Sequence, residues 1–209
     1  MTKTPITTIA MLALFAGSAA AQDLARIAVP DSKITIEGTS NLHGWACRTG
    51  DANAIVELDA AAAAQLSIAP PRALKRVDVK VPVKSLKCGH GAMDNNLYKA
   101  LNADKTPEIS YIMASFEAVP GDIKDSFSLK TVGTLTVNGN ERKISMDVVA
   151  TRLPDGTVLA KGVVPVKMTD FGITPPTAIF GRLKTGDEIK VNFELTVGPK
   201  AIAAATTDK

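Results

Sequence analysis

The chain has 209 residues, with 24 lysines and arginines against 21 aspartates and glutamates, so its formal net charge is only +3. Acidic and basic residues are interleaved along the chain, which excludes the basic patch of a nucleic-acid-binding protein. Aromatic residues make up only 4% of the chain, so an interior must be built mostly from small aliphatic side chains. A chain of this length suits a single domain.

The first 21 residues have the organisation of a cleaved signal peptide. Lys3 supplies a positive charge, residues 6–16 are apolar, and residues 19–21 are alanines that place small side chains before the expected cut. We therefore expect the mature chain to begin at Gln22 and to be exported to the periplasm. The apolar run is shorter than the roughly 20 residues that a membrane anchor needs, and no other segment predicts a transmembrane helix.

The first two strand patterns lie at residues 33–37 and 76–84. In each segment the apolar side chains fall on one face and the polar side chains on the other. Such period-two alternation indicates an antiparallel strand with one face against an apolar interior and one face in water. Between them, the alanine run at residues 60–64 fits a short helical turn, but no cap or charge fixes it there.

Cys47 and Cys88 are the only cysteines, and an even number in an exported chain favours a disulfide bond. Closing the loop between them would stabilise the fold by roughly 4 kcal/mol in the chain-entropy model. The second interpretation is a metal site that adds His43 and His90, but these spacings match no common zinc framework. We therefore expect a disulfide, between the loop after the first strand and the start of the helix described next, and no metal.

Only residues 89–101 have a convincing helical periodicity, which is carried by Met93, Leu97, Ala100 and Leu101. Pro107 prevents continuation of the helix, and strand alternation resumes at residues 109–113. We expect this short helix to plug the sheet or to cover one of its sides.

Residues 127–168 predict a meander of long antiparallel strands. Asn138-Gly139 and Asp155-Gly156 separate its alternating runs, and both pairs favour hairpin turns that need positive φ. Small residues dominate the apolar face of the last run, which consists of Val158, Ala160, Gly162, Val164, Val166 and Met168. With the further alternation at residues 189–197, these long strands favour a closed barrel, which removes exposed sheet edges. Such a barrel is either filled by its side chains or holds one small ligand.

The sequence thus predicts an all-β fold, with one antiparallel barrel domain over residues 22–200, one short helix, and a disordered tail at residues 201–209. It contains no nucleophile elbow, glycine-rich phosphate loop or zinc-protease motif. We therefore expect no catalytic residues, no enzymatic activity and no cofactor.

Several segments resemble the YceI-like family. Residues 36–45 fit the opening signature G-T-S-x-L-H-x-W, and the resemblance continues in order through residues 93–107, 133–139 and 171–195. It implies a lipocalin-like antiparallel β-barrel that binds a polyisoprenoid or another amphiphilic lipid in a long apolar pore, often in the periplasm. The two cysteines lie outside the general pattern and resemble a disulfide-bearing subgroup.

The candidate ligand-binding residues form three groups. The apolar face from Val158 to Met168 is assigned to the pore, and Gly162 is its most informative position because a ring inserted there should enter the pore. Phe171, Ile173 and Phe180, in the long proline-rich connection, are candidate lid residues. Trp45, beside His43, is a candidate for orienting a ligand head group, although packing of a buried Trp is the alternative interpretation.

We expect a carrier for an amphiphilic lipid or polyisoprenoid. The alternative is an exported interaction or stress-related module with a filled barrel and no lipid ligand. The sequence predicts neither the ligand's chain length nor the oligomeric state.

Overall fold

The computed structural model describes residues 24–29, 31–59, 74–121, 125–178 and 180–198. The segment predicted to be a signal peptide, the alanine run at 60–64 and the predicted tail at 201–209 therefore lie outside the described residues. The elements in chain order are β1 (Leu24–Val29), β2 (Asp31–Ser40), β3 (Gly44–Thr49), β4 (Asn53–Asp59), β5 (Leu74–Pro82), the 3-10 helix η1 (Val83–Ser85), α2 (Gly91–Ala100), β6 (Glu108–Pro120), β7 (Ser126–Val137), β8 (Asn140–Arg152), β9 (Val158–Lys167), the 3-10 helix η2 (Met168–Phe171), β10 (Thr177–Ala178) and β11 (Leu183–Val197).

The predicted all-β fold is confirmed, and the segments with period-two alternation form strands. Residues 33–37 lie in β2, the meander forms β7 to β9, and residues 189–197 end β11. The hairpin between β7 and β8 turns at Asn138 and Gly139, whose φ values are 51° and 72°. Both residues therefore adopt the positive φ that the Asn-Gly signal predicted.

The strands form one strongly curled antiparallel sheet in the order β1-β4-β5-β6-β7-β8-β9-β11-β2-β3, with β10 paired to β11. The β1–β4 register continues without a shift into the β2–β3 register, from Val29↔Ala54 to Ile34↔Thr49. The segments β1–β2 and β3–β4 are therefore the two arms of one long hairpin. Because β2 also pairs with β11 and β4 also pairs with β5, this hairpin brings the two sides of the curled sheet together.

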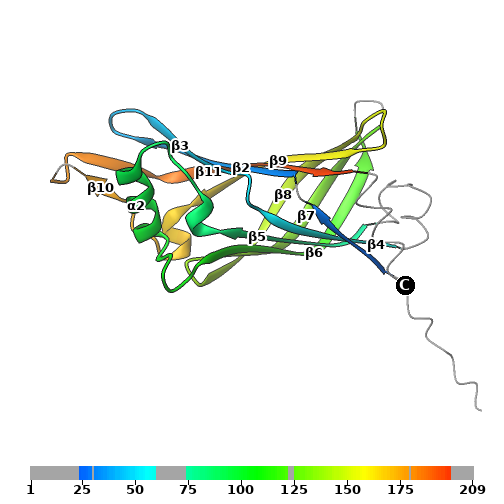
Figure 1. Ribbon diagram of the computed structural model, residues 1–209, viewed down its shortest axis with the longest axis horizontal. Helices are drawn as coiled ribbons and strands as arrows, with labels where there is room; N and C mark the ends of the chain where they lie inside the picture. The colour runs from blue at the N-terminus through cyan, green and yellow to red at the C-terminus, as the bar shows by residue number, and fades with distance from the viewer. Residues whose placement is uncertain (1–23, 30, 60–73, 122–124, 179, 199–209) are drawn as a thin grey trace, which may run out of the picture.

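β1 and β3 are the first and last strands of the strand order, so the two edges of the sheet lie there. Figure 1 shows α2 beside β3 at one end of the molecule, which we call the α2 end. Arg48, within β3, forms an isolated antiparallel bridge with Lys87, which lies in the segment that leads into α2. The helix thus covers the side of the sheet where strand pairing stops, as the sequence predicted for its short helical segment.

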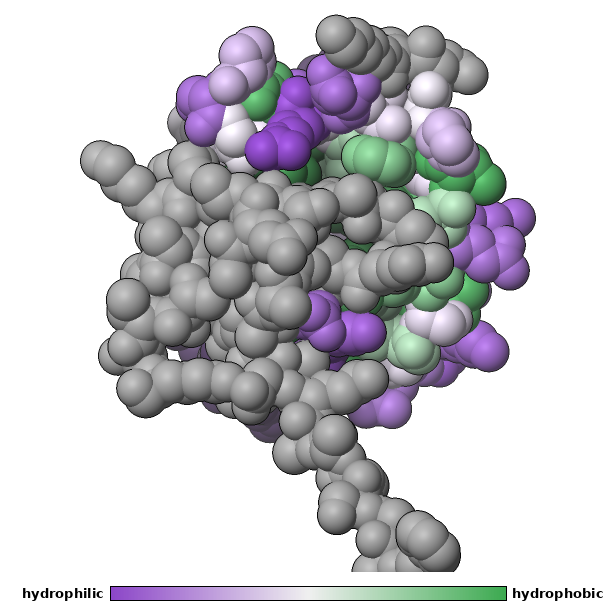
Figure 2. All heavy atoms as spheres, turned by 90° about the vertical axis from the view of Figure 1, so that its right-hand side faces the viewer, coloured by the Kyte–Doolittle hydropathy of each residue, from purple (hydrophilic) through white to green (hydrophobic). Residues whose placement is uncertain are grey.

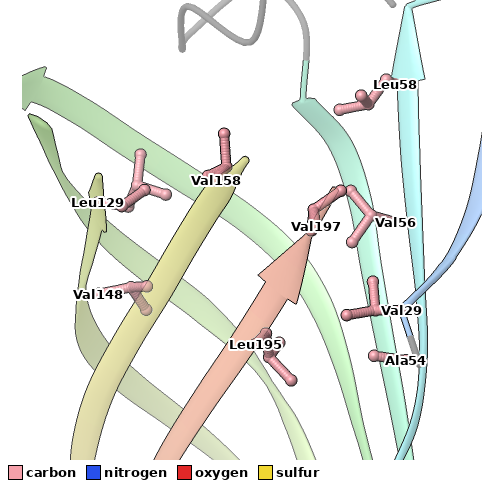
Figure 3. Close-up of a cluster of buried hydrophobic side chains, with 10 residues drawn as sticks. Val29, Ala54, Val56, Leu58, Leu129, Val148, Val158, Leu195 and Val197 are labelled. Carbon is pink, nitrogen blue, oxygen red and sulfur yellow. The ribbon is translucent and has the colours of Figure 1, made fainter. Parts of the chain in front are cut away.

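Buried hydrophobic side chains pack inside the curled sheet in clusters along its length. The cluster remote from α2 includes Leu129, Val148 and Val158, which Figure 3 shows on β7, β8 and β9, across the interior from Val29 and Val56. A second cluster at the α2 end is built from Ile36, Val83, Leu86, Leu101, Ala103, Met168, Phe171 and Ile173. Figure 2 faces the end remote from α2 and shows hydrophobic side chains inside a rim of hydrophilic ones where described residues are visible.

Candidate functional site

A cavity of about 390 Å³, which we call the lumen, lies inside the curled sheet. Strands β2 to β11, the helix α2 and η2 all contribute to its lining. The lining extends from His43 and Pro176 at the α2 end to Leu58 and Arg152 at the opposite end. The lumen therefore follows the long axis of the sheet and is not a shallow depression on its surface.

Aliphatic side chains dominate this lining, and the charged groups among its described residues, Lys167 and Arg152, lie at the two ends. His43 and Lys167 line the lumen at the α2 end, and Arg152 lines it at the opposite end. None of the described lining residues is an aspartate or glutamate. A charged group buried without a partner costs several kcal/mol, so an uncharged middle is the arrangement that an apolar guest requires.

One polar pair lies within the middle of the lumen, where Tyr111 and Thr131 are both buried. The Tyr111 hydroxyl donates to Thr131 Oγ1 at 3.3 Å, and Thr131 Oγ1 donates to the Met146 carbonyl oxygen at 3.2 Å. Burial raises the pKa of Tyr111, with the hydrogen bond to Thr131 acting weakly in the opposite direction. The phenol is therefore neutral near pH 7 and is already hydrogen-bonded within the wall.

The predicted pore face, which runs along β9 to the first residue of η2, points into the lumen at five of its six positions. The five residues that line the cavity are Val158, Ala160, Val164, Val166 and Met168. On the other face, Lys161 forms an ion pair with Glu194, Nζ to Oε2 at 3.0 Å, and Val163 is 51% exposed. The period-two rule therefore predicts which side chains of this strand face the lumen and which face outward.

Gly162 differs from the prediction, because it is not part of the lumen lining. It pairs directly with Phe193 on β11, and a Cβ on Gly162 would overlap the Phe193 ring and lie 2.8 Å from the Asp147 carbonyl oxygen. The Phe193 ring covers the glycine and lines the lumen in its place. A ring introduced at residue 162 would therefore meet Phe193 rather than enter open space.

An aromatic ring also covers a glycine at two further inward positions. The Trp45 ring covers Gly38 between β3 and β2, and the Tyr111 ring covers Gly133 between β6 and β7. In each case an added Cβ would overlap the ring. A glycine on the apolar face of an alternating strand is the sequence signal for such aromatic coverage, since the ring replaces the missing side chain.

Phe171 and Ile173, two of the predicted lid residues, are buried and line the lumen beside η2. Two contacts hold this segment in place. Asn140 Nδ2 donates to the Phe171 carbonyl oxygen at 2.9 Å. The Asp187 carboxylate accepts from the Thr169 hydroxyl at 2.7 Å and from the Thr169 backbone N–H at 2.9 Å, and these bonds lower the pKa of Asp187.

Phe180, the third predicted lid residue, does not line the lumen. Its relative exposure is 107%, and it adopts a positive φ of 52°. It lies in the connection between β10 and β11, and Figure 1 shows this hairpin extending beyond α2 at the end of the molecule. The hairpin therefore carries its ring away from the cavity.

Trp45 packs into the wall of the lumen, which is one of the two interpretations that the sequence left open. It is half-buried, packs over Gly38 and lines the lumen, and its Nε1–H donates to the Thr39 carbonyl oxygen at 3.2 Å. His43 is exposed at the rim, where its Nδ1–H donates to the Gly44 carbonyl oxygen at 2.8 Å. The Trp45 indole is thus a wall residue whose polar edge is already satisfied by the backbone.

The predicted disulfide is confirmed, because Cys47 and Cys88 are bonded to each other. Cys47 lies within β3, and not in a loop after the first strand as the sequence suggested, because residues 44–49 continue the long hairpin. Cys88 lies just before α2, and its N–H donates to Asp94 Oδ1 at 2.7 Å. The bond therefore fastens the start of the helix to the edge strand β3.

The helix α2 contributes lining residues that sequence reasoning did not assign to the site. Met93, Asn96, Leu97 and Ala100 all line the lumen. On another side of the helix, the Tyr98 hydroxyl donates to the Leu86 carbonyl oxygen at 2.8 Å. Helical spacing of the apolar residues was the available signal, but it does not say which surface they contact.

Among the residues that the structure describes, no group of three or more His, Cys, Asp or Glu side chains is arranged to hold a metal ion. In the same part of the chain, no helix has the length and apolar character needed to cross a bilayer.

The family profile described as a YceI-like domain matches residues 27–197. The fold is similar to that of Burkholderia cenocepacia BcnA, with 16% identity, a TM-score of 0.61, and coverage of 79% of this chain and 96% of that one. It is also similar to a polyisoprenoid binding domain from Saccharophagus degradans, with 11% identity, a TM-score of 0.61, and coverage of 84% and 99%. The Campylobacter jejuni YCEI protein is 21% identical, with a TM-score of 0.53 and coverage of 73% and 83%. No match was found among curated proteins.

Proposed function

Because the chain belongs to the YceI-like domain family, we propose that it is an exported, periplasmic binding or carrier protein that holds a polyisoprenoid or another amphiphilic lipid in its lumen. The observation that carries this proposal is the apolar lumen of about 390 Å³, in which the charged groups of the described lining residues lie at the two ends. The Saccharophagus degradans neighbour, described as a polyisoprenoid binding domain, supports the same class of ligand. The signal-peptide pattern at residues 1–21 supports export.

The size and chemistry of the lumen suit a single hydrocarbon chain. Ligand pockets typically enclose about 300 to 1,000 Å³ and are lined mainly by apolar side chains. Each methylene group that leaves water contributes about 0.8 kcal/mol to binding. A prenyl or acyl chain therefore needs no specific polar partner along the aliphatic walls.

We place the polar head of the ligand at the α2 end. Ser40, His43, Asn96 and Lys167 all line the lumen there, and they offer hydroxyl, imidazole, amide and ammonium groups. Arg152 lines the opposite end. An amphiphile bound with its head between α2 and the β2–β3 turn leaves its tail among the side chains of β6 to β9.

The lumen favours binding over catalysis. Its buried phenol, Tyr111, donates to Thr131 and is held neutral by burial. Among the lining residues that the structure describes, no carboxylate lies beside it to serve as a general base. The role proposed for these side chains is to enclose the ligand and to exclude water.

Titration of the protein with a fluorescent prenyl alcohol tests this function. Ala160→Phe adds a ring to a half-buried position on the lumen wall, whereas Lys161→Phe adds the same ring to the outer face of the same strand. We expect uptake by the unmodified protein and by Lys161→Phe, and reduced uptake by Ala160→Phe. Circular dichroism of each variant establishes that the fold is retained.

The proposal is overturned if the unmodified protein takes up no prenyl or acyl chain. Normal uptake by a folded Ala160→Phe protein would show that the ligand binds outside the lumen. Val164→Phe provides a second lumen variant, because Val164 is buried and also lines the cavity.

A further inference from the structure

Two large hydrophobic side chains are strongly exposed at the α2 end. Leu42, in the turn between β2 and β3, is 71% exposed, and Phe180, between β10 and β11, is 107% exposed. They are the two most exposed large hydrophobic residues in the described part of the chain. Elsewhere, Val163 is an example of an exposed hydrophobic residue on the outer face of the curled sheet.

Hydrogen bonds join the two loops that carry these side chains. Asn41 Nδ2 donates to the Arg182 carbonyl oxygen at 2.8 Å, and Asn41 Oδ1 accepts from the Lys184 backbone N–H at 2.9 Å. The Asn41 backbone N–H also donates to the Lys184 carbonyl oxygen at 3.0 Å. Leu42 and Phe180 therefore belong to one surface, although they are far apart in the sequence. Figure 1 shows both loops projecting at the same end.

This surface is positively charged. The two segments, residues 40–44 and 180–184, contain the exposed cations Arg182 and Lys184, and neither contains an aspartate or glutamate. Asp187, the next acidic residue along β11, accepts hydrogen bonds from Thr169. Exposed apolar side chains flanked by cations are the composition that associates with anionic lipid head groups.

The lumen reaches the base of the same loops. Ser40 and His43 from the first loop, and Leu183 and Thr185 from the second, belong to its lining. An apolar ligand that leaves the lumen here emerges beside the exposed hydrophobic side chains. Passage through water would expose its hydrocarbon chain, whereas direct contact with a bilayer would not.

We propose that Leu42, Phe180, Arg182 and Lys184 form a docking tip that inserts its two apolar side chains into an anionic lipid bilayer and places the α2 end of the lumen against that bilayer. The inference goes beyond ligand storage, because it assigns a second lipid-binding surface outside the lumen. It also commits to a bilayer and not to a protein partner. The two apolar side chains stand on the tips of neighbouring loops beside cations and do not form a flat hydrophobic patch, which suits shallow insertion among head groups.

Co-sedimentation with vesicles tests the docking tip. The protein is mixed with vesicles of phosphatidylcholine, or of phosphatidylcholine with phosphatidylglycerol, and the bound fraction is measured against lipid concentration. We expect binding to the anionic vesicles and little binding to phosphatidylcholine alone, with affinity that falls as salt is raised.

Matched variants separate the apolar and charged contributions. Leu42→Ser with Phe180→Ser should abolish most vesicle binding, whereas Val163→Ser, which removes an exposed hydrophobic residue from the barrel wall, should leave it unchanged. Asn41 is kept in all variants so that the two loops stay joined.

For the charges, Arg182→Gln with Lys184→Gln should weaken binding to anionic vesicles by at least tenfold, since each cation near such a surface contributes roughly a fivefold gain in affinity. Lys75→Gln with Lys130→Gln removes two exposed cations from the outer wall at the opposite end of the strands. This control has the same net charge and should bind anionic vesicles as the unmodified protein does.

The docking tip is refuted if the unmodified protein does not bind anionic vesicles, which is also the outcome expected if these loops contact a protein. Equal losses in the tip variants and their controls would refute it as well. Uptake of a prenyl alcohol by the variants distinguishes this failure from failure of the proposed function, because uptake depends on the lumen alone. If both proposals hold, the tip variants retain uptake but deliver ligand to anionic vesicles more slowly.

Discussion

Substitution of Gly162 by alanine tests the packing that shapes the lumen. The added Cβ would overlap the Phe193 ring and lie 2.8 Å from the Asp147 carbonyl oxygen. The ring can rotate or shift, but the carbonyl belongs to β8 and can move only with its strand. Overpacking of this kind typically costs about 1 to 3 kcal/mol. We therefore expect Gly162→Ala to lower the free energy of unfolding by that amount.

A double-mutant cycle with Phe193→Ala separates the two contacts. In the Phe193→Ala background the ring is gone and only the Asp147 carbonyl remains close to residue 162. The cost of Gly162→Ala should then fall by about 1 kcal/mol, within the range of coupling energies for residues in direct contact. Urea denaturation, followed by circular dichroism, measures all four corners of the cycle.

Gly44→Ala is the matched control, because Gly44 also lies in a strand but its added Cβ would be 3.6 Å from the nearest atom, the Gly38 carbonyl oxygen. It should change stability little. The reasoning is refuted if Gly162→Ala is as harmless as Gly44→Ala. It is also refuted if the cost of Gly162→Ala is the same, within about 0.5 kcal/mol, with and without the Phe193 ring.

Three further predictions concern the supports of the lumen. Replacing both Cys47 and Cys88 by alanine should lower the free energy of unfolding by up to about 4 kcal/mol, because a long loop is no longer closed in the unfolded chain; an unchanged denaturation midpoint would contradict this. The lowered pKa of Asp187 means that its contribution to stability is complete above its unfolded pKa of about 3.9 and is lost as the pH falls through the lower folded pKa. Asp187→Ala should therefore destabilise the protein near pH 7 and progressively less in acid; a pH-independent difference would be the contrary result. Thr131→Val should destabilise the protein by about 1 to 3 kcal/mol, because the buried Tyr111 hydroxyl loses its acceptor; a neutral effect in denaturation would show that water or a ligand satisfies it.

Much of the fold follows from local patterns in the sequence. The small apolar residues Val158, Ala160, Gly162, Val164 and Val166 take every second position of β9, and only one assignment of faces keeps Lys161 in water. The turn at Asn138-Gly139 requires positive φ, which those residue types adopt readily. These features depend on neighbouring residues alone, so a single sequence is sufficient to predict them.

The strands before β5 were only partly recognised. Residues 44–59 contain β3 and β4, and Ala54, Val56 and Leu58 alternate there, but the Gly50-Asp51 pair separates this short run from the residues around Cys47. Cys47 was therefore expected in a loop. The long hairpin becomes visible only when the registers on both sides of residue 30 are compared.

The site was less predictable because its shape depends on pairing between distant strands. That Phe193 covers Gly162 follows from the register of β9 against β11, which alternation does not fix. Phe180 lies in the same proline-rich connection as Phe171 and Ile173, so the sequence predicts a lid residue there. Its ring is exposed because the β10–β11 hairpin extends beyond α2, and no local sequence pattern predicts that extension.

Native mass spectrometry of the protein, purified without detergent, tests whether the lumen holds a lipid. We expect a population heavier than the bare chain by the mass of one prenyl or acyl lipid, and this population should be depleted in the Ala160→Phe variant but retained in Lys161→Phe. A protein that carries only its own mass, and that gains no lipid when incubated with long prenyl alcohols, would refute lipid binding in the lumen.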